Sequence, residues 1–242
     1  DMGDAFDKMR ESLEGKKYVE QYVQTLTHEI KSPISAIRGA AELLEEEMPL
    51  ESRKQFLSNI RNEAERIQDL VERMLKLSEL ETKKSLETME VVLMAPLVRT
   101  VLEGKGPMLS RKRLEVEALF DEALAVQGDP FLLHQAIANL LQNAIDFSPA
   151  GGRILLRTAA SGSRVNFTVE DQGPGIPEYA KERIFQKFFS LQRPDTGKKS
   201  TGLGLNFVRE VASLHNGRIY LENLPEAGFL ASFVLPVYKK GE

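Results

Sequence analysis

The chain has 242 residues, of which 42% are hydrophobic and 28% are charged, and its formal net charge is -4. This length allows one large domain or two smaller ones, and the small excess of acid gives no reason to expect nucleic acid as the main partner. Cysteine is absent, which excludes disulfides, cysteine nucleophiles and thiolate metal sites. The sequence has neither an apolar run near the roughly 20 residues that cross a bilayer nor a signal-peptide pattern at its start.

Two long amphipathic helices are predicted in the first third of the chain. From Tyr18 to about Met48, apolar residues recur every three or four positions and cluster on one face at about 100° per residue. Ser52 is the expected N-cap of a second helix that runs to about Glu81. Two such helices cannot bury their apolar faces alone, so we expect a four-helix bundle made by two copies of the chain. We interpret residues 1–17 as the end of an upstream helical signalling segment of a longer protein.

The pattern changes after a polar linker at residues 84–89. Strands are predicted at residues 90–94, 113–118, 124–127, 153–158, 164–170, 218–222 and 229–235, and helices at 96–109, 130–147, 178–184 and 203–214. This order lacks the strict alternation of a doubly wound sheet, so we predict an α+β sandwich with helices on one face of a mixed sheet. The polar stretch between Ile184 and Gly202 is the candidate for a mobile lid.

The first motif is HEIKSP at residues 28–33. By helical phase, His28 lies about 180° from the apolar stripe and therefore points into solvent. Glu29 is adjacent and can accept a ring proton, which raises the nucleophilicity of the imidazole. Ser32 lies one turn further along the same face and can hold a water beside His28. This segment alone leaves open an indifferent surface histidine.

The second motif lies on the predicted helix 130–147, where Asn139, Asn143 and Asp146 share one side and apolar residues take the other. Asparagine is a poor helix former, so a merely solvated face should not favour it. Amide oxygens one turn apart can ligate a hard cation such as Mg²⁺ that is otherwise held by phosphates and water. An ordinary polar helix face is the alternative.

Two glycine motifs complete the set. DQGPGIP at residues 171–177 directly follows a predicted strand, so Asp171 can accept a hydrogen bond from an exocyclic amine while the glycines let a flat base approach the backbone. A simple tight turn is the alternative. STGLGL at residues 200–205 opens a helix whose free N–H groups and positive dipole end favour phosphate. It matches neither the P-loop nor the dinucleotide pattern.

The order and spacing of these motifs, with the aromatic segment IFQKFF at residues 184–189 between the two glycine motifs, resemble the sensor histidine kinases of two-component systems. Residues 18–23, 37–42 and 143–147 look most like the CreC-type sensors. The resemblance implies a dimerisation and histidine phosphotransfer domain at residues 18–83. It also implies a catalytic ATP-binding domain of the Bergerat type, found in histidine kinases and Hsp90-like ATPases, at residues 90–242.

The resemblance also implies residue roles. His28 matches the phosphorylated histidine, with Glu29 and Ser32 beside it. Asn139 matches a Mg²⁺ ligand, and Asp171 matches the carboxylate that reads the adenine amine. The other nucleotide-binding positions implied by the resemblance are Asn143, Phe147, Gly173, Gly175, Lys187, Thr201, Gly202, Leu203 and Gly204.

The expected function is ATP-dependent autophosphorylation of His28, followed by transfer of the phosphoryl group to an Asp of a response regulator. The resemblance implies ATP and Mg²⁺, a homodimer, and the receiver domain of a response regulator as partner. It places the chain in the cytoplasmic portion of a sensor that is anchored in the inner membrane through segments absent from this sequence.

Three positions depart from the family's pattern. Asp146 stands where a Lys or Arg is usual, and a carboxylate beside a triphosphate needs an offsetting charge. Lys199 and Ser200 stand where further glycines are common. Ser32 replaces the commoner Thr or Asn, and the phosphatase activity of many such kinases depends on that side chain. The cations expected to offset Asp146 are Lys187, Lys198 and Lys199.

Two other functions stay open on the sequence. A regulatory module that binds nucleotide without transferring phosphate would suit Asp146 and the reduced second glycine motif. Another ATPase of the same fold, of the chaperone or mismatch-repair type, would not need a solvent-facing histidine on a dimer bundle, so His28 argues against it.

Overall fold

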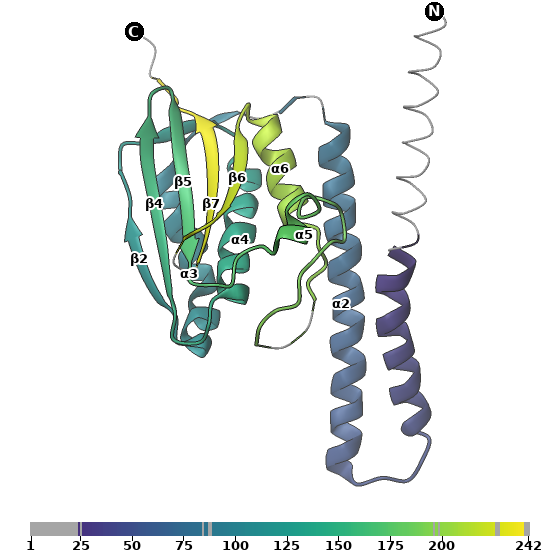
Figure 1. Ribbon diagram of the computed structural model, residues 1–242. Coiled ribbons are helices and arrows are strands. Elements are labelled where there is room, and N and C mark those ends of the chain that lie inside the picture. The colour runs from purple at the N-terminus through teal and green to yellow at the C-terminus, as the bar shows by residue number, and fades with distance from the viewer. Residues whose placement is uncertain are drawn as a thin grey trace, which may run out of the picture. The chain divides into compact units, whose positions relative to one another are not determined.

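The computed structural model describes residues 24, 26–83, 85–86, 89–195, 197, 199–225 and 228–239 (Figure 1). The chain divides into two compact units, Asp1–Lys76 and Leu77–Glu242. The expected upstream segment 1–17, the start of the first predicted helix and Lys198 lie outside the described residues. In the part of the chain that is described, no helix combines the length and apolar character needed to span a membrane.

The first unit is a helical hairpin. Its first helix covers residues 26–43 of the described chain, and the second, α2 (Leu50–Thr82), runs on into the second unit. The predicted N-cap at Ser52 is wrong, because α2 already begins at Leu50. The N–H of Arg53 donates to the carbonyl of Pro49 at 3.0 Å, so Pro49 closes the first turn and Ser52 lies inside the helix.

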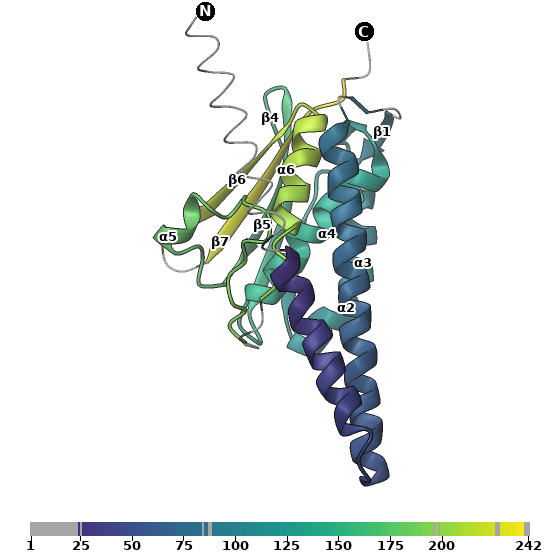
Figure 2. The same ribbon diagram turned by 90° about the vertical axis from the view of Figure 1, so that its right-hand side faces the viewer.

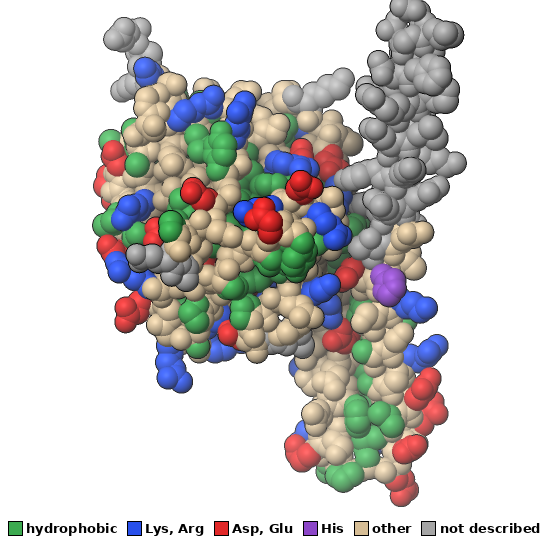
Figure 3. Space-filling view, viewed as in Figure 1, with side chains coloured by type: hydrophobic (Ala, Val, Ile, Leu, Met, Phe, Trp, Pro, Cys, Tyr) green, Lys and Arg blue, Asp and Glu red, His purple; other side chains and the backbone are tan. Residues whose placement is uncertain are grey.

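Helix α2 has two apolar faces. Side chains at spacings of three and four are buried or partly buried, as expected for the packed face of a hairpin. These are Phe56, Ile60, Ile67, Leu70 and Met74. A second row recurs every seven residues and is exposed, and it consists of Leu50, Leu57, Ala64 and Val71. Figure 3 shows hydrophobic side chains on the surface at the turn end of this hairpin.

The second unit contains seven strands. They are β1 (Glu90–Leu93), β2 (Glu115–Leu119), β3 (Ala125–Gly128), β4 (Arg153–Ser161), β5 (Arg164–Asp171), β6 (Arg218–Asn223) and β7 (Phe229–Pro236). Five of them form one sheet in the order β2-β4-β5-β7-β6, in which β2 is parallel to β4 and the other pairs are antiparallel. The short antiparallel pair β1-β3 stands apart from it. Every predicted strand is present, and the sheet is mixed as expected.

Three helices cover one face of this sheet: α3 (Met94–Lys112), α4 (Pro130–Phe147) and α6 (Gly204–Leu214) (Figure 2). Fully buried side chains of the sheet, such as Phe167 and Phe233, meet those of α4, such as Ile137 and Leu140, in one hydrophobic core. This arrangement confirms the predicted α+β sandwich. Leu80 near the end of α2 belongs to the same core, so the compact unit begins inside that helix.

The helix predicted at residues 178–184 is shorter in the structure. Helix α5 covers only Glu178–Lys181. Beyond it, the N–H of Arg183 donates to Ala180 at 2.9 Å and that of Gln186 donates to Arg183 at 2.7 Å. These bonds close turns of three residues rather than α-helical turns, so the chain leaves the helix before it reaches the lid.

His215 joins the end of helix α6 to the start of helix α4. It caps the end of α6 and is buried, with Nδ1 2.7 Å from the carbonyl of Val211. Its Nε2 accepts the N–H of Asp129, the N-cap of α4, at 3.0 Å. Because one nitrogen accepts, the ring is neutral and Nδ1 carries the proton. Burial lowers the pKa of His215, which keeps this link intact near neutral pH.

Candidate functional site

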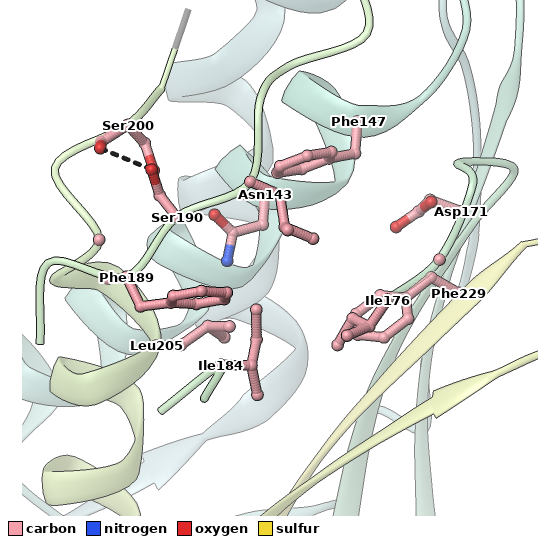
Figure 4. A pocket seen from close by; sticks show the side chains of 14 residues that line it. Asn143, Phe147, Asp171, Ile176, Ile184, Phe189, Ser190, Ser200, Leu205 and Phe229 are labelled. Carbon is pink, nitrogen blue, oxygen red and sulfur yellow. Dashed lines mark hydrogen bonds between the residues drawn. The ribbon is translucent and has the colours of Figure 1, made fainter. Parts of the chain in front are cut away.

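A cavity of about 670 Å³, partly open to solvent, lies between α4, the end of β5, the lid and the start of α6 (Figure 4). Its lining residues are Asn143, Phe147, Asp171, Gly175, Ile176, Ile184, Phe189, Ser190, Leu191, Ser200, Gly202, Gly204, Leu205 and Phe229. Most of the wall is apolar, with a few polar groups at defined points.

Helix α4 carries the asparagines to this cavity. Pro130 starts the helix, and the Asp129 side chain caps it by accepting the N–H groups of Phe131 and Leu132 at 2.9 and 3.1 Å. The apolar side of α4 is buried in the core, so its polar side must face the opposite way. Asn143 lies on that side and lines the cavity, between the Asp171 end and the lid end (Figure 4).

Asn139 lies one turn before Asn143 and is partly buried. Its amide oxygen is 3.5 Å from the place where a β-carbon on Gly204 would stand, so it adjoins the start of α6. No group of three or more His, Cys, Asp or Glu side chains suited to a metal ion occurs among the described residues. A cation at Asn139 would therefore depend on oxygens that the ligand brings.

Asp171 ends strand β5 at the bottom of the cavity. It is only 4% exposed, and its Oδ1 accepts the N–H of Gly173 at 2.7 Å. Burial raises the pKa of Asp171 to about 6, against the lowering effect of the Gly173 hydrogen bond. A carboxyl group among apolar side chains is an acceptor for an N–H donor on a flat ring.

The turn after Asp171 is clamped by Asn223, the last residue of β6. Its Oδ1 accepts the N–H of Ile176 at 2.7 Å, and its Nδ2 donates to the carbonyl of Ile176 at 2.8 Å. Gly175 has φ +73°, and a β-carbon there would stand 2.5 Å from the Asn223 amide oxygen. Glycine is thus required both by the backbone angle and by the clamp. Nothing in the sequence pattern singled out Asn223.

The second glycine motif packs against the aromatic segment. Gly202 has φ +65°, and its carbonyl accepts the N–H of Phe188 at 3.1 Å. A β-carbon on Gly202 would lie 2.5 Å from the carbonyl carbon of Phe188. This close approach brings Gly204 to the cavity wall as the first residue of α6. The N–H groups of that first turn have no acceptor inside the helix and suit an anion.

The lid has its own internal bonds. The Ser190 hydroxyl donates to the carbonyl of Ser200 at 2.9 Å, and Gln192 pairs with Lys199 in an antiparallel bridge. The guanidinium of Arg183 stacks over the Phe189 ring, 4.6 Å from its centroid. These contacts bring the two ends of the lid together along one side of the cavity.

The structure brings together some of the predicted nucleotide-binding residues and separates others. Asn143, Phe147, Asp171, Gly175, Gly202 and Gly204 all line the cavity. The predicted residues that do not line it are Asn139, Gly173, Lys187, Thr201 and Leu203. Leu203 is buried, and Lys187 is 10% exposed and forms an ion pair with Glu81 at 2.7 Å.

Asp146 has a partner that the sequence did not suggest. Its Oδ2 lies 2.6 Å from Nη2 of Arg193 in the lid, and its Oδ1 accepts from Gln142 at 2.9 Å. Of the three cations expected to offset Asp146, Lys187 forms an ion pair with Glu81 at 2.7 Å. Of the other expected cations, Lys199 takes part in the lid bridge and Lys198 lies outside the described residues.

The predicted phosphoacceptor residues lie on the first helix of the hairpin. His28 and Ser32 are exposed and Glu29 is partly exposed, while Pro33 on the same helix is buried. The helical phase thus places the histidine as predicted, on the solvent side of a continuous helix.

Two family models match separate parts of the chain. Residues 18–83 match the His Kinase A (phospho-acceptor) domain, and residues 128–239 match the histidine kinase-, DNA gyrase B- and HSP90-like ATPase domain. Between them they include every residue named above for the site and for the phosphoacceptor helix.

Among curated proteins, the chain is similar to the sensor protein CreC of Escherichia coli (strain K12), with 46% identity over 234 residues that make up 97% of this chain and 49% of the relative. It is 32% identical to the adaptive-response sensory kinase SasA of Crocosphaera subtropica over 96% of this chain and 63% of that protein. The chain therefore spans about half to two thirds of the length of these relatives.

Among solved structures, the chain is similar to the histidine kinase ThkA crystallised in complex with the response regulator protein TrrA. The TM-score is 0.77 and the identity is 27%, over 96% of this chain and 66% of the matched one. This likeness extends over nearly the whole chain, which includes the parts that match the two family models.

Proposed function

The chain belongs to the sensor histidine kinases, and on that premise we propose that it transfers the γ-phosphoryl group of ATP to its own His28 and then to an Asp of a response regulator. One observation carries the nucleotide half of this proposal. The cavity has a buried carboxylate, Asp171, at one end and extends from there to the lid and the start of α6.

The adenine ring fits the Asp171 end of the cavity. Its exocyclic amine would donate to the carboxylate of Asp171, while the side chains of Ile176 and Phe229 offer apolar contact to the ring. Gly175 leaves the backbone open at this wall because it has no side chain. A purine without an amine at that position would leave Asp171 unpaired and bind more weakly.

The phosphates fit the opposite end, where Ser190 and Ser200 lie (Figure 4). The first turn of α6, beginning at Gly204, presents free N–H groups and the positive end of its dipole. Asn143 lies between the two ends and can donate from its amide.

Mg²⁺ fits the donor that this site offers. Asn139 supplies a neutral amide oxygen beside the start of α6, which suits a hard cation that keeps phosphate and water oxygens for most of its shell. The cation would neutralise charge on the β- and γ-phosphates when bound. In this proposal the domains are residues 18–83 for dimerisation and phosphotransfer and residues 90–242 for ATP binding.

His28 is the proposed nucleophile. One imidazole nitrogen forms a bond to the γ-phosphorus while the bond from that phosphorus to its bridging oxygen breaks and ADP leaves. Glu29 accepts the proton that the ring loses, which maintains the charge balance. Phosphoryl transfer depends mainly on positioning and charge neutralisation, so an exposed histidine on a rigid helix suffices as acceptor. Ser32, exposed one turn away, would orient the water that hydrolyses the phosphorylated Asp of the response regulator in a phosphatase reaction.

The receiver domain of a response regulator is the proposed partner, in line with the complex in which ThkA was crystallised. A homodimer through the hairpin is proposed because α2 exposes an apolar row. We also propose that the chain is the cytoplasmic portion of a membrane-anchored sensor, as the family resemblance implies.

A phosphorylation assay tests the proposal. The purified chain, incubated with γ-labelled ATP and Mg²⁺, is expected to acquire acid-labile, base-stable label. His28→Gln should abolish this label while ATP affinity stays the same, because His28 does not line the nucleotide cavity. His134→Gln, which alters a histidine of α4 outside the cavity lining, is the matched control and should keep the label.

Label that survives in His28→Gln would contradict the choice of acceptor. ATP binding without any label, in the full-length protein as well, would favour the regulatory nucleotide-binding module instead. The structure weakens the case for that alternative, because the carboxylate of Asp146 is already paired with Arg193.

A further inference from the structure

Two ion pairs join the lid to neighbouring helix ends, one to the end of α4 and one to Lys112 at the end of α3. Arg193 Nη2 lies 2.6 Å from Asp146 Oδ2, and Lys112 Nζ lies 2.6 Å from Asp195 Oδ2. Lys112 also donates to the carbonyl of Ile145 at 2.8 Å, so it bridges the last turn of α4 and the lid. Positions 193 and 195 are thus held by opposite charges against the adjacent ends of α4 and α3.

Asp146 is a fixed and largely buried anchor for this contact. Its side chain is 14% exposed, and Gln142 one turn earlier donates to its Oδ1 at 2.9 Å. The Gln142 amide oxygen in turn accepts from Lys105 of α3 at 2.9 Å. A carboxylate held from behind in this way has little freedom of rotation, so its second oxygen points in a set direction.

Arg193 uses only part of its donor set on Asp146. A guanidinium has five N–H donors arranged as a planar fork. Nη2 faces Asp146, while Nε is buried and has no hydrogen-bond acceptor among the described residues. An unused donor edge beside a fixed one is the arrangement in which an arginine contacts a second anion.

The second anion can be a phosphate group of a nucleotide bound in the neighbouring cavity. Asn143 and Phe147, on either side of Asp146 along α4, both line it, and so does Leu191, two residues before Arg193. Ser190 marks the lid end of the cavity, where the phosphates are proposed to lie.

We propose that Asp146 and Arg193 are a charge-exchanged pair, in which the lid rather than α4 supplies the cation for the terminal phosphates and Asp146 positions it. This inference rests on the proposed function, because it assigns residues to the same nucleotide site. Arg193, whose side chain is 31% exposed, contacts the β- and γ-phosphates through N–H donors that Asp146 does not take. Asp146 touches no phosphate and acts only through Arg193.

The charge-exchanged pair makes the lid sensitive to the number of phosphates. A ligand with three phosphates reaches the Arg193 fork and holds the lid on α4, whereas a monophosphate does not. The pair thereby explains how an acidic residue is tolerated at position 146, because the guanidinium of Arg193 neutralises the carboxylate that orients it.

Nucleotide affinity measured with ATP, ADP and AMP tests this assignment on the full chain. Arg193→Gln is expected to weaken ATP binding about tenfold, to weaken ADP binding less, and to leave AMP binding unchanged, since a charge-assisted contact to the terminal phosphates is lost. Arg193→Lys should recover only part of the loss, because an ammonium cannot contact both anions with a planar fork. Arg99→Gln removes an exposed charge on α3 and is the matched control.

The positioning role of Asp146 is tested by a double-mutant cycle. Asp146→Asn should weaken ATP binding about threefold or more in the parent and cause no further loss in the Arg193→Gln background. The exchanged variant Asp146→Arg with Arg193→Asp restores a cation at the site and should bind ATP more tightly than either single charge reversal. Thermal unfolding midpoints of all variants, together with AMP affinity, show whether the fold is kept.

Three results would overturn the inference. Equal ATP affinity of the parent and Arg193→Gln removes the phosphate contact. Additive losses of ATP affinity from Asp146→Asn and Arg193→Gln would show that Asp146 does not act through Arg193. An equal loss of AMP and ATP affinity in Arg193→Gln would show that Arg193 does not contact the terminal phosphates. A parent chain that binds no adenine nucleotide at all is a different result, since then the proposed function fails as well.

Discussion

The carboxyl group of Asp171 is buried, and this burial costs the folded chain stability near neutral pH. It lies beside Gly173, and burial raises its pKa in the folded chain to about 6, against about 3.9 for an Asp side chain in water. The folded chain therefore holds this proton more tightly than the unfolded chain does. As the pH rises from about 4 to 6, the folded state loses up to about 3 kcal/mol of stability at this one residue, and the loss persists above pH 6.

Replacing Asp171 by Asn should separate stability from binding. The amide oxygen still accepts from Gly173 and no charge is buried, so we expect the free energy of unfolding at pH 7.5 to rise by about 1–3 kcal/mol. ATP binding should be lost, because the amide NH₂ meets the amine of the ring. Urea unfolding of parent and variant at pH 4.5 and 7.5 measures this, and a stability difference that is the same at both pH values would contradict it.

At the scale of elements, the lid depends on one glycine that has no substitute. Gly202 combines a φ of +65° with a close approach to the backbone of Phe188. Gly197, also in the lid, has a φ of +63° but no atom within 4 Å of the position of a β-carbon. Both glycines thus have a positive φ that disfavours other residues, but only at Gly202 would a β-carbon meet neighbouring atoms.

Alanine at each position separates these two effects. Gly197→Ala should lower the free energy of unfolding by about 1 kcal/mol through backbone strain alone. Gly202→Ala should lower it by about 2–4 kcal/mol and weaken ATP binding, because the backbone at Phe188 must move as well. Denaturant unfolding and nucleotide titration measure both, and equal effects of the two substitutions would show that the Phe188 contact does not matter.

At the scale of the whole molecule, the exposed apolar row on α2 indicates that another protein surface packs against it. Leu57 and Val71 are 53% and 41% exposed, and they share a face with Leu50 and Ala64 at intervals of seven residues. A seven-residue apolar repeat is the pattern with which helices pack against each other in bundles. A second copy of the hairpin presents the same row and can cover it.

A charge in this row should dissociate the dimer. Leu57→Lys is expected to raise the dissociation constant of the dimer at least tenfold, roughly the 1.5–3 kcal/mol lost when a leucine is no longer buried. Leu119→Lys, which changes an exposed leucine of β2, is the matched control and should not alter it. Sedimentation equilibrium measures both, and a monomeric parent chain would refute the bundle.

What the sequence alone determined was local. Helix α4 runs over residues 130–147 as predicted, because its N-cap, its Pro at the first position and its apolar period all lie within the segment itself. The solvent side of His28 followed from helical phase, and the positions of Asp171, Gly175 and Gly202 at the cavity followed from motifs a few residues long. Where a cap depended on how the preceding turn closes, as at Ser52, the local signal failed.

The partners of polar groups that lie far apart in the sequence became visible only in the folded chain. Asn223 clamps Ile176 from 47 residues away, and His215 joins Asp129 from 86 residues away. The sequence likewise showed an unexplained acid at position 146 but not the arginine of the lid that faces it. Side-chain periodicity describes which face is buried, whereas the pairing of charges depends on how loops fold back onto the sheet and its helices, and no local pattern records that.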